Sequence, residues 1–175
     1  MILGYDTHEW RRLVPLGILA ACVVSLTTAY TAQYGFDLEP CILCLYQRVP
    51  FFVNGGLAVL LLFAGIRGNW RTWLVVVCAV VFFANSALAF YHVGVEQHWW
   101  HSVTGCGGGL PTEMSIQSMK ADLLKPRVKP CDEVDFQFLG ISIATYNVVY
   151  SGALGLATLV GLRLMKRSEE DKRRG

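Results

Sequence analysis

Charged residues are scarce in this sequence, and their scarcity argues against a water-soluble fold. Only 16% of the 175 residues are Asp, Glu, Lys or Arg, whereas a typical soluble domain has about 25%. Hydrophobic residues account for 54% of the chain. The net charge of +2 comes from basic residues that are better explained as membrane anchors. The sequence therefore gives no support to a nucleic-acid partner.

The few charged residues are also unevenly placed. Four stretches contain no Asp, Glu, Lys or Arg, and each is about long enough to cross a hydrocarbon core as a helix, which needs roughly 20 residues. Four buried soluble helices of this length would be hard to house in so short a chain. We therefore predict an all-α membrane protein, a four-transmembrane-helix bundle forming a single domain. The predicted spans are about 13–34, 43–66, 72–92 and 140–162, with a loop over 93–139 and a tail over 163–175.

The distribution of Lys and Arg predicts how these spans are oriented, because basic residues are retained on the cytoplasmic side. One side collects Arg11, Arg12, Arg67 and Arg71, together with the six basic residues of the predicted tail. The other side has a short segment without basic residues and the loop 93–139, where six acidic residues outnumber four basic ones. We expect both termini in the cytoplasm and the long loop on the outer side.

Four of the six cysteines fall on this outer side. Cys41 and Cys44 form a C-x-x-C motif where the second span begins, and Cys106 and Cys131 lie in the loop. A C-x-x-C is a redox-capable dithiol, because two intervening residues bring both sulfurs within reach of one disulfide. The natural pairs are 41–44 and 106–131, although four cysteines allow three connectivities. The loop pair can be a structural staple or can exchange with the first pair.

Two further residues are candidates for binding a ligand beside the dithiol. Arg48 lies four residues after Cys44 and so on the same helical face, where it can partner a thiolate or simply extend to the lipid headgroups. His92 ends the third span near the predicted depth of Cys44 and can hydrogen-bond a ligand or cap its helix. A thiol pair and a fixed positive charge at the edge of a bilayer predict electron transfer between protein thiols and a molecule in the membrane.

The loop itself contains one predicted element. Within 113–124, Ile116, Met119 and Leu123 recur at i, i+3 and i+7, which is typical of an amphipathic helix. We expect this short helix to lie on the membrane surface, although packing against the rest of the loop is nearly as well supported.

A metal centre is a weaker interpretation of the same residues. Zinc commonly has four protein ligands, and His98 and His101 would complete a set with Cys41 and Cys44 only if the loop folded over them. A bis-histidine haem needs histidines on two facing spans, and the sequence does not distribute them in this way. We therefore expect no metal.

These features together resemble the DsbB family of bacterial inner-membrane disulfide-generating proteins. The resemblance covers most of the chain. It rests on the four spans, on a proline-preceded Cys41-x-x-Cys44 with Arg48 after it, and on Cys131 followed by the D-F-x-F-L-G sequence of 135–140. A lone C-x-x-C is common, but this combination is highly specific.

The resemblance implies a protein-dithiol:quinone oxidoreductase of the inner membrane that generates disulfides. In such a protein, a DsbA-like thioredoxin-fold partner in the periplasm attacks Cys106 of a loop disulfide. The released Cys131 then exchanges with Cys41. Cys44 passes the electrons, as a thiolate, to a quinone in the membrane.

The same resemblance implies that ubiquinone or menaquinone is the electron acceptor, bound beside Arg48. His92 is the second candidate for quinone binding, because of its predicted depth. The nearest rival is a vitamin K epoxide reductase-like quinone reductase, which also has a four-helix core and two cysteine pairs. There the loop cysteines precede the C-x-x-C, whereas here they follow it, and this order favours DsbB. A non-catalytic membrane metal or haem protein is the rival from another class.

Overall fold

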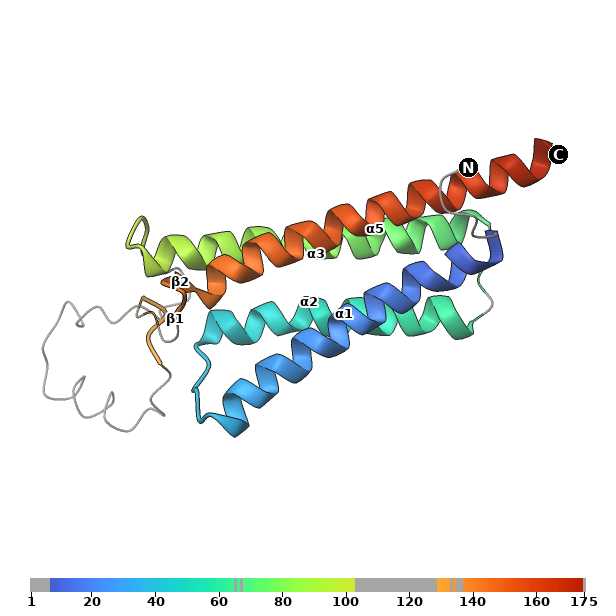
Figure 1. Cartoon of the computed structure of the whole chain (residues 1–175). Helices are drawn as coiled ribbons and strands as arrows, with labels where there is room; N and C mark the ends of the chain where they lie inside the picture. Colours follow the sequence, from blue (N-terminus) through green and yellow to red (C-terminus); the bar gives the residue numbers. More distant parts are fainter. Residues whose placement is uncertain are drawn as a thin grey trace, which may run out of the picture.

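Four long helices form the body of the protein in the computed structural model (Figure 1). Each is long and apolar enough to cross a membrane, so the prediction of an all-α membrane protein with four transmembrane helices is confirmed. The last helix continues through most of the charged segment that follows the fourth uncharged stretch. The helices are α1 (Thr7–Gly35), α2 (Ile42–Phe63), α3 (Asn69–Glu96) and α5 (Ile143–Arg174).

Only part of the loop between α3 and α5 belongs to the structure as described. Cys106 and the predicted amphipathic helix 113–124 lie outside the described residues. The described end of the loop is a short antiparallel ribbon of β1 (Gln137–Phe138) and β2 (Ile141–Ser142), which the sequence analysis did not predict. The structure describes residues 7–64, 66, 68–102, 129–132, 134 and 137–174.

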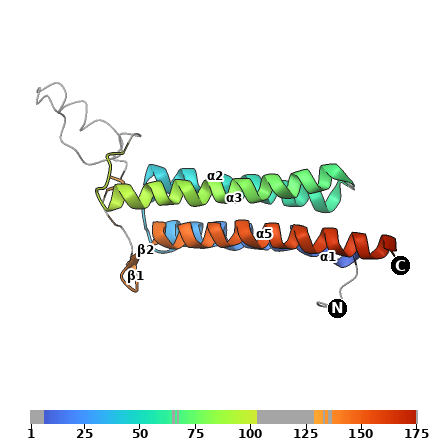
Figure 2. The ribbon, with the colours of Figure 1, turned by 90° about the horizontal axis from the view of Figure 1, so that it is seen from above.

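The helices pack as a square in cross-section. Seen from above, α2 and α3 lie in one layer and α1 and α5 in the other (Figure 2). Packing of α3 against α5 and of α1 against α2 joins the two layers. The start of α1 and the end of α5 lie at one end of the bundle, and the connection between α1 and α2 lies at the other, beside the ribbon (Figure 1). That second end is called the dithiol end below, because Cys41 and Cys44 lie there.

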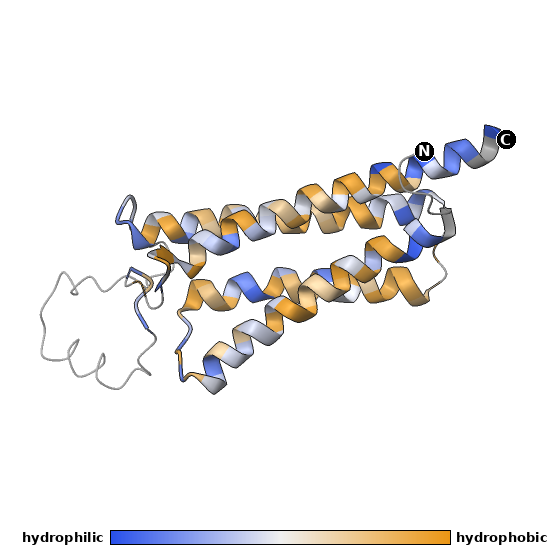
Figure 3. Ribbon diagram, viewed as in Figure 1, coloured by the Kyte–Doolittle hydropathy of each residue, from blue (hydrophilic) through white to orange (hydrophobic). Residues whose placement is uncertain are grey.

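Hydrophobic residues predominate along the middle of the four helices (Figure 3). Its core includes Phe51 and Phe82, whose rings meet edge to face with centroids 6.2 Å apart. Cys22 and Cys78 are buried in the same cluster as free thiols, as expected for cysteines that act as small hydrophobic side chains. Large hydrophobic residues such as Val24 are exposed on the outer surface, where lipid would cover them.

Arg71 ties the helices together at the end of the bundle opposite the dithiol. Its side chain is buried and donates hydrogen bonds to the carbonyl oxygens of Leu61 (3.1 Å), Ile66 (3.3 Å) and Arg11. The last carbonyls of a helix have no partner within the helix. One arginine therefore satisfies backbone groups of α2, of the following turn and of α1.

At the dithiol end, α3 finishes under an aromatic side chain. The Trp100 indole donates a hydrogen bond from Nε1 to the Tyr91 carbonyl oxygen (3.0 Å) and stacks on the Tyr91 ring. The ring also covers Gly94 so closely that a Cβ atom at this position would overlap it. Glycine is needed here for this close approach.

We expect Gly94→Ala to lower the free energy of unfolding, because the added methyl group must displace the Trp100 ring and break its hydrogen bond. Overpacking of this kind costs about 1–3 kcal/mol, more than alanine gains in helix propensity. Gly56→Ala is the matched control, because a Cβ atom there meets nothing within 4 Å. Thermal unfolding in detergent measures both variants, and equal melting temperatures would show that Trp100 does not pack on α3.

Candidate active site

Cys41 and Cys44 lie where α2 begins. Cys41 is the N-cap residue with extended backbone angles (φ −69°, ψ 167°), and its sulfur accepts a hydrogen bond from the Cys44 backbone N–H at 3.3 Å. Pro40 comes directly before it and favours a helix start at this point. Proline has no backbone N–H group to donate within a helix, so a helix rarely extends through it toward the N-terminus. The free N–H groups and the positive end of the helix dipole both favour a negatively charged sulfur at this place.

Cys41 is only 3% exposed, and hydrogen-bonding groups of the protein surround its sulfur. The Cys44 sulfur lies 3.0 Å away and His92 Nε2 lies 3.5 Å away. The hydrogen bond with Cys44 is the main reason why the pKa of the Cys41 thiol falls from 9.0 to about 5, and His92 lowers it further, while burial acts in the opposite direction. Stabilising a thiolate stabilises the reduced pair, which makes the corresponding disulfide a stronger oxidant.

His92 is held by a line of polar side chains that crosses the bundle. Gln47 Nε2 lies 3.1 Å from His92 Nδ1, and Gln47 Oε1 accepts a hydrogen bond from Asn147 Nδ2 at 2.7 Å. The Ser151 hydroxyl donates to Asn147 Oδ1 at 2.8 Å and accepts from Asn85 Nδ2 at 2.9 Å. These bonds join α2, α3 and α5 in the buried interior, and they end at the imidazole that faces Cys41.

The direction of these hydrogen bonds places the proton of His92. Asn147 donates to the Gln47 carbonyl oxygen, so the Gln47 amide nitrogen is the atom that faces Nδ1 and donates to it. A neutral imidazole that accepts at Nδ1 carries its proton on Nε2. The Nε2–H group can then donate to the Cys41 sulfur.

The same assignment bears on metal binding. The donor atoms of Cys41, Cys44 and His92 all lie within 4.8 Å of one another, a spacing at which a metal ion can be held. Metal binding would need an unprotonated Nε2, whereas the hydrogen bonds of Gln47 put the proton there. The two sulfurs are also closer, at 3.0 Å, than the about 3.8 Å of two thiolates around tetrahedral zinc. The geometry therefore favours thiol chemistry.

Arg48 lies two turns into α2 and turns toward α1. Its Nη1 donates to Gln33 Oε1 at 2.6 Å, and its guanidinium carbon lies 5.0 Å from the centre of the Tyr30 ring. These contacts fix the position of the guanidinium group. No other hydrogen bond of Arg48 is found among the residues that the structure describes, so the remaining N–H groups can bind a ligand.

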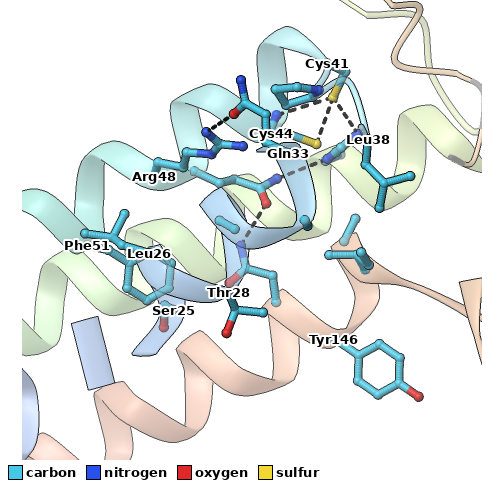
Figure 4. A pocket seen from close by; sticks show the side chains of 18 of the residues that line it. Ser25, Leu26, Thr28, Gln33, Leu38, Cys41, Cys44, Arg48, Phe51 and Tyr146 are labelled. Carbon is cyan, nitrogen blue, oxygen red and sulfur yellow. Dashed lines mark hydrogen bonds between the residues drawn. The ribbon is translucent and has the colours of Figure 1, made fainter. Parts of the chain in front are cut away.

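A cavity of about 500 Å³ adjoins the dithiol between α1, α2 and α5. Figure 4 shows the sulfurs of Cys41 and Cys44 at one end, Leu26 and Phe51 at the other, and Arg48 between them. The α1 residues along the cavity run from position 24 to position 33, about 14 Å of helix. Pockets of this size bind small organic molecules. The cavity can hold a ring with polar groups near the sulfurs and an apolar tail farther along the helices.

The structure also brings Cys131 to the first cysteine pair. Cys131 is fully buried and disulfide-bonded, and it belongs to one small buried cluster with Cys41, Leu43 and Val95. Cys41 and Cys44 are reduced and are not joined in a disulfide. Cys106 is outside the described part of the chain, so the 106–131 pairing stays a prediction. The proximity of Cys131 to Cys41 makes exchange between the two pairs geometrically reasonable.

Sequence analysis missed several residues of this site. Gln33, Gln47, Glu96 and Asn147 line the cavity with the predicted residues, and none was singled out beforehand. For the three amides the signal was present, because uncharged polar residues inside an apolar span are rare and usually face the bundle interior. Glu96 fell within the predicted loop. The partners of the amides, however, lie on other helices and depend on how the helices pack.

Comparison with known proteins gives a consistent result. The family model described as disulfide bond formation protein DsbB matches residues 11–161. Disulfide bond formation protein B of Acidovorax sp. (strain JS42) is 32% identical over 86% of this chain and 85% of its own length. The protein of the same name from Azoarcus sp. (strain BH72) is 29% identical over 85% and 90%. An uncharacterized protein of Rickettsia prowazekii is 26% identical over 94% and 93%.

We expect the Cys41 thiolate of the reduced protein to form with a midpoint near pH 5, where an ordinary thiol titrates near pH 9. Because the folded-state pKa is lowered, the thiolate adds stability that is complete above about pH 9 and is lost as the pH falls through about 5. The ultraviolet absorbance of the thiolate, taken as the difference between the wild type and Cys41→Ser, follows this titration.

Two variants test the causes of this shift. Cys44→Ala should raise the pKa of Cys41 more than His92→Gln does, because the hydrogen bond with Cys44 is the larger contribution. Cys44→Ser keeps a hydrogen-bond donor and should raise it less than Cys44→Ala. A wild-type midpoint above pH 8 would contradict the arrangement of groups around the sulfur.

Proposed function

Because the chain belongs to the DsbB family of disulfide bond formation proteins, we propose that it reoxidises a DsbA-like thioredoxin-fold protein and passes the electrons to a membrane quinone. As a member of this family with four helices long enough to cross a membrane, it is a disulfide-forming oxidoreductase and a multi-pass protein of the bacterial inner membrane. Its full activity on this proposal is that of a protein-dithiol:quinone oxidoreductase.

The observation that carries the proposal is the position of the dithiol at the polar end of the cavity. Cys44 and Cys41 line the same cavity as Arg48, so a small oxidant bound there would be in contact with both the sulfurs and a fixed positive charge. The polar end suits the carbonyl oxygens of a quinone, and the apolar part along α1 suits its isoprenoid tail. Ubiquinone and menaquinone share this chemistry, and either fits the proposal.

The reaction is balanced by two thiol–disulfide exchanges and one oxidation. The partner's thiolate attacks Cys106 of the proposed loop disulfide and releases Cys131, which attacks Cys41 of the oxidised C-x-x-C and releases Cys44. Closure of the partner's own disulfide and of the loop disulfide leaves Cys41 and Cys44 reduced. The quinone supplies the acceptor for two electrons and two protons, which restores the Cys41–Cys44 disulfide.

Hydrogen-bond donors and one fixed charge in the site support this sequence of events. The helix N-terminus and His92 stabilise a thiolate at Cys41, so Cys41 is a good leaving group when the loop cysteines exchange with it. Arg48 offers N–H groups to a carbonyl oxygen and to negative charge that develops there. On this proposal, Arg48 and His92 are the quinone-binding residues.

The fold also supports the proposed orientation in the membrane. The start of α1 and the end of α5 lie at one end of the bundle (Figure 1), where most basic residues of the chain are found. The dithiol lies at the opposite end. By the positive-inside rule, we place both termini in the cytoplasm and the dithiol with the loop 93–139 at the periplasmic side.

A trapping experiment tests the partner half of the proposal. A thioredoxin-fold protein that keeps only its nucleophilic cysteine should form a mixed disulfide with Cys106 and release Cys131 toward Cys41. The adduct should accumulate, because the partner has no second thiol of its own to resolve the bond. Peptide mass spectrometry of the purified adduct identifies the linked cysteine.

The matched controls use the other cysteines of the chain. Replacement of the buried Cys22 and Cys78 by serine should leave the adduct unchanged, and Cys106→Ser/Cys131→Ser should abolish it. If that second, folded variant still oxidises an intact partner at the normal rate, the loop pair is only a staple and the proposed route is wrong.

Substitution of Arg48 tests the quinone half. Arg48→Gln should raise the KM for quinone by about tenfold or more, because a hydrogen bond from a charged group is worth about 1.5–3 kcal/mol. Arg48→Lys should be intermediate, since it keeps the charge and loses the planar fork. Quinone-dependent oxidation of the reduced partner in detergent gives both kcat and KM.

Arg12→Gln is the control for this measurement, because Arg12 is exposed at the far end of α1. It should leave KM unchanged. A folded Arg48→Gln protein with wild-type quinone kinetics would remove Arg48 from the binding site.

A further inference from the structure

Glu96 is a buried carboxylate that the mechanism above does not use. It lies in the last turn of α3 and is only 9% exposed. Its Oε2 atom has no hydrogen-bond partner among the residues that the structure describes. A negative charge at the C-terminal end of a helix is unfavourable, and burial of an incompletely paired carboxylate adds to that cost. Retaining Glu96 in this position calls for a functional reason.

Glu96 lies beside the imidazole that contacts the dithiol. Glu96 Oε1 lies 3.8 Å from His92 Nε2, and the same nitrogen lies 3.5 Å from the Cys41 sulfur. Gln47 occupies the other ring nitrogen. The proton on Nε2 therefore lies between a thiol sulfur and a carboxylate, and a proton that leaves one can be taken up by the other.

Glu96 also borders the place where the electron acceptor of the proposed function would bind. It lines the cavity together with the dithiol and Arg48. A proton held on Glu96 is therefore already at the wall of that cavity and does not have to cross the apolar core. The titratable and charged groups along this cavity are Glu39, Cys41, Cys44, Arg48, His92, Glu96, Tyr146 and Tyr150.

We propose that Glu96, acting through His92, stores one of the two protons of the reduced dithiol and delivers it to the cavity when the disulfide forms. This inference rests on the proposed function. Closing the disulfide forms one S–S bond and gives up two electrons and two protons. One proton is shared by the hydrogen-bonded sulfurs of Cys41 and Cys44, and the other resides on the His92–Glu96 pair. Both protons and both electrons go to the quinone.

A proton count tests this without any quinone. Cys106→Ser/Cys131→Ser leaves the C-x-x-C as the only outer cysteine pair, and ferricyanide oxidises that pair by taking electrons alone. At neutral pH, a pH-indicator dye should record two protons released per disulfide formed. Glu96→Gln keeps the shape of the side chain but cannot carry a proton, so the count should fall to about one, by the stoichiometry of the two stores.

Glu39→Gln is the matched control, because Glu39 lines the same cavity but is exposed. The Glu39→Gln protein should release two protons per disulfide. Glu96→Asp keeps a carboxylate, so it should also release two protons where Glu96→Gln releases one. Two protons from Glu96→Gln, or an equal fall in Glu39→Gln, would overturn the proposal. If Glu96→Gln fails to fold, a count of one from folded Glu96→Asp would also overturn it, because that variant keeps a carboxylate.

Steady-state kinetics give a second, independent readout. Glu96→Gln should lower kcat for quinone reduction by about a hundredfold, the scale of general acid–base catalysis, with little change in KM and with loss of the pH dependence of kcat. Trapping of the single-cysteine partner by Cys106 should proceed at the wild-type rate. Wild-type kcat and pH profile in Glu96→Gln would overturn the role of Glu96.

The two readouts also separate this inference from the function on which it rests. One outcome is that the wild-type protein does not reduce quinone, while the proton count still falls from two to one when Glu96 is replaced by Gln. That outcome would disprove the quinone reaction and support the proton store. A wild-type protein that reduces quinone while Glu96→Gln behaves identically would leave the function standing and remove Glu96 from it.

Discussion

The structure depends on one constraint, that polar groups inside a membrane-spanning bundle must find partners within the protein. Asn85, Ser151, Asn147 and Gln47 bond to one another across three helices, and the line of bonds ends on His92. Among the described residues, Asn85 Oδ1 is the buried oxygen of this line without a partner. The hydrogen bonds that join these buried amides therefore also fix the orientation of the imidazole. Bundle packing and the chemistry of the dithiol are parts of one network.

The reactive end follows a related electrostatic requirement. A thiolate near the edge of a low-dielectric region needs nearby positive charge or hydrogen-bond donors. Cys41 receives them from the start of its own helix and from His92. Arg48, held by Gln33 and Tyr30, adds a fixed cation farther along the cavity. The cavity thus places its charged and hydrogen-bonding groups near the sulfurs and apolar side chains toward the core. An acceptor with a polar ring and an apolar tail would match this arrangement.

Sequence patterns predicted what is local and missed what depends on packing. The four uncharged stretches predicted the helices because each needs only its own length and composition. Cys41, Cys44 and Arg48 could be grouped because they share the first turns of one helix. The burial of Cys131 beside Cys41 and the bond from Arg48 to Gln33 join distant segments. No periodicity within a single helix encodes such contacts, so they required the packed structure.

Gln47 and Glu96 give the imidazole of His92 two different neighbours, and the difference has a chemical consequence. An amide can fix a tautomer but cannot accept a proton at neutral pH, whereas a carboxylate can. With the amide on Nδ1 and the carboxylate near Nε2, the carboxylate that can take up a proton from the Cys41 side is on the wall of the cavity. In the proposed reaction, electrons and protons both leave the dithiol toward that cavity.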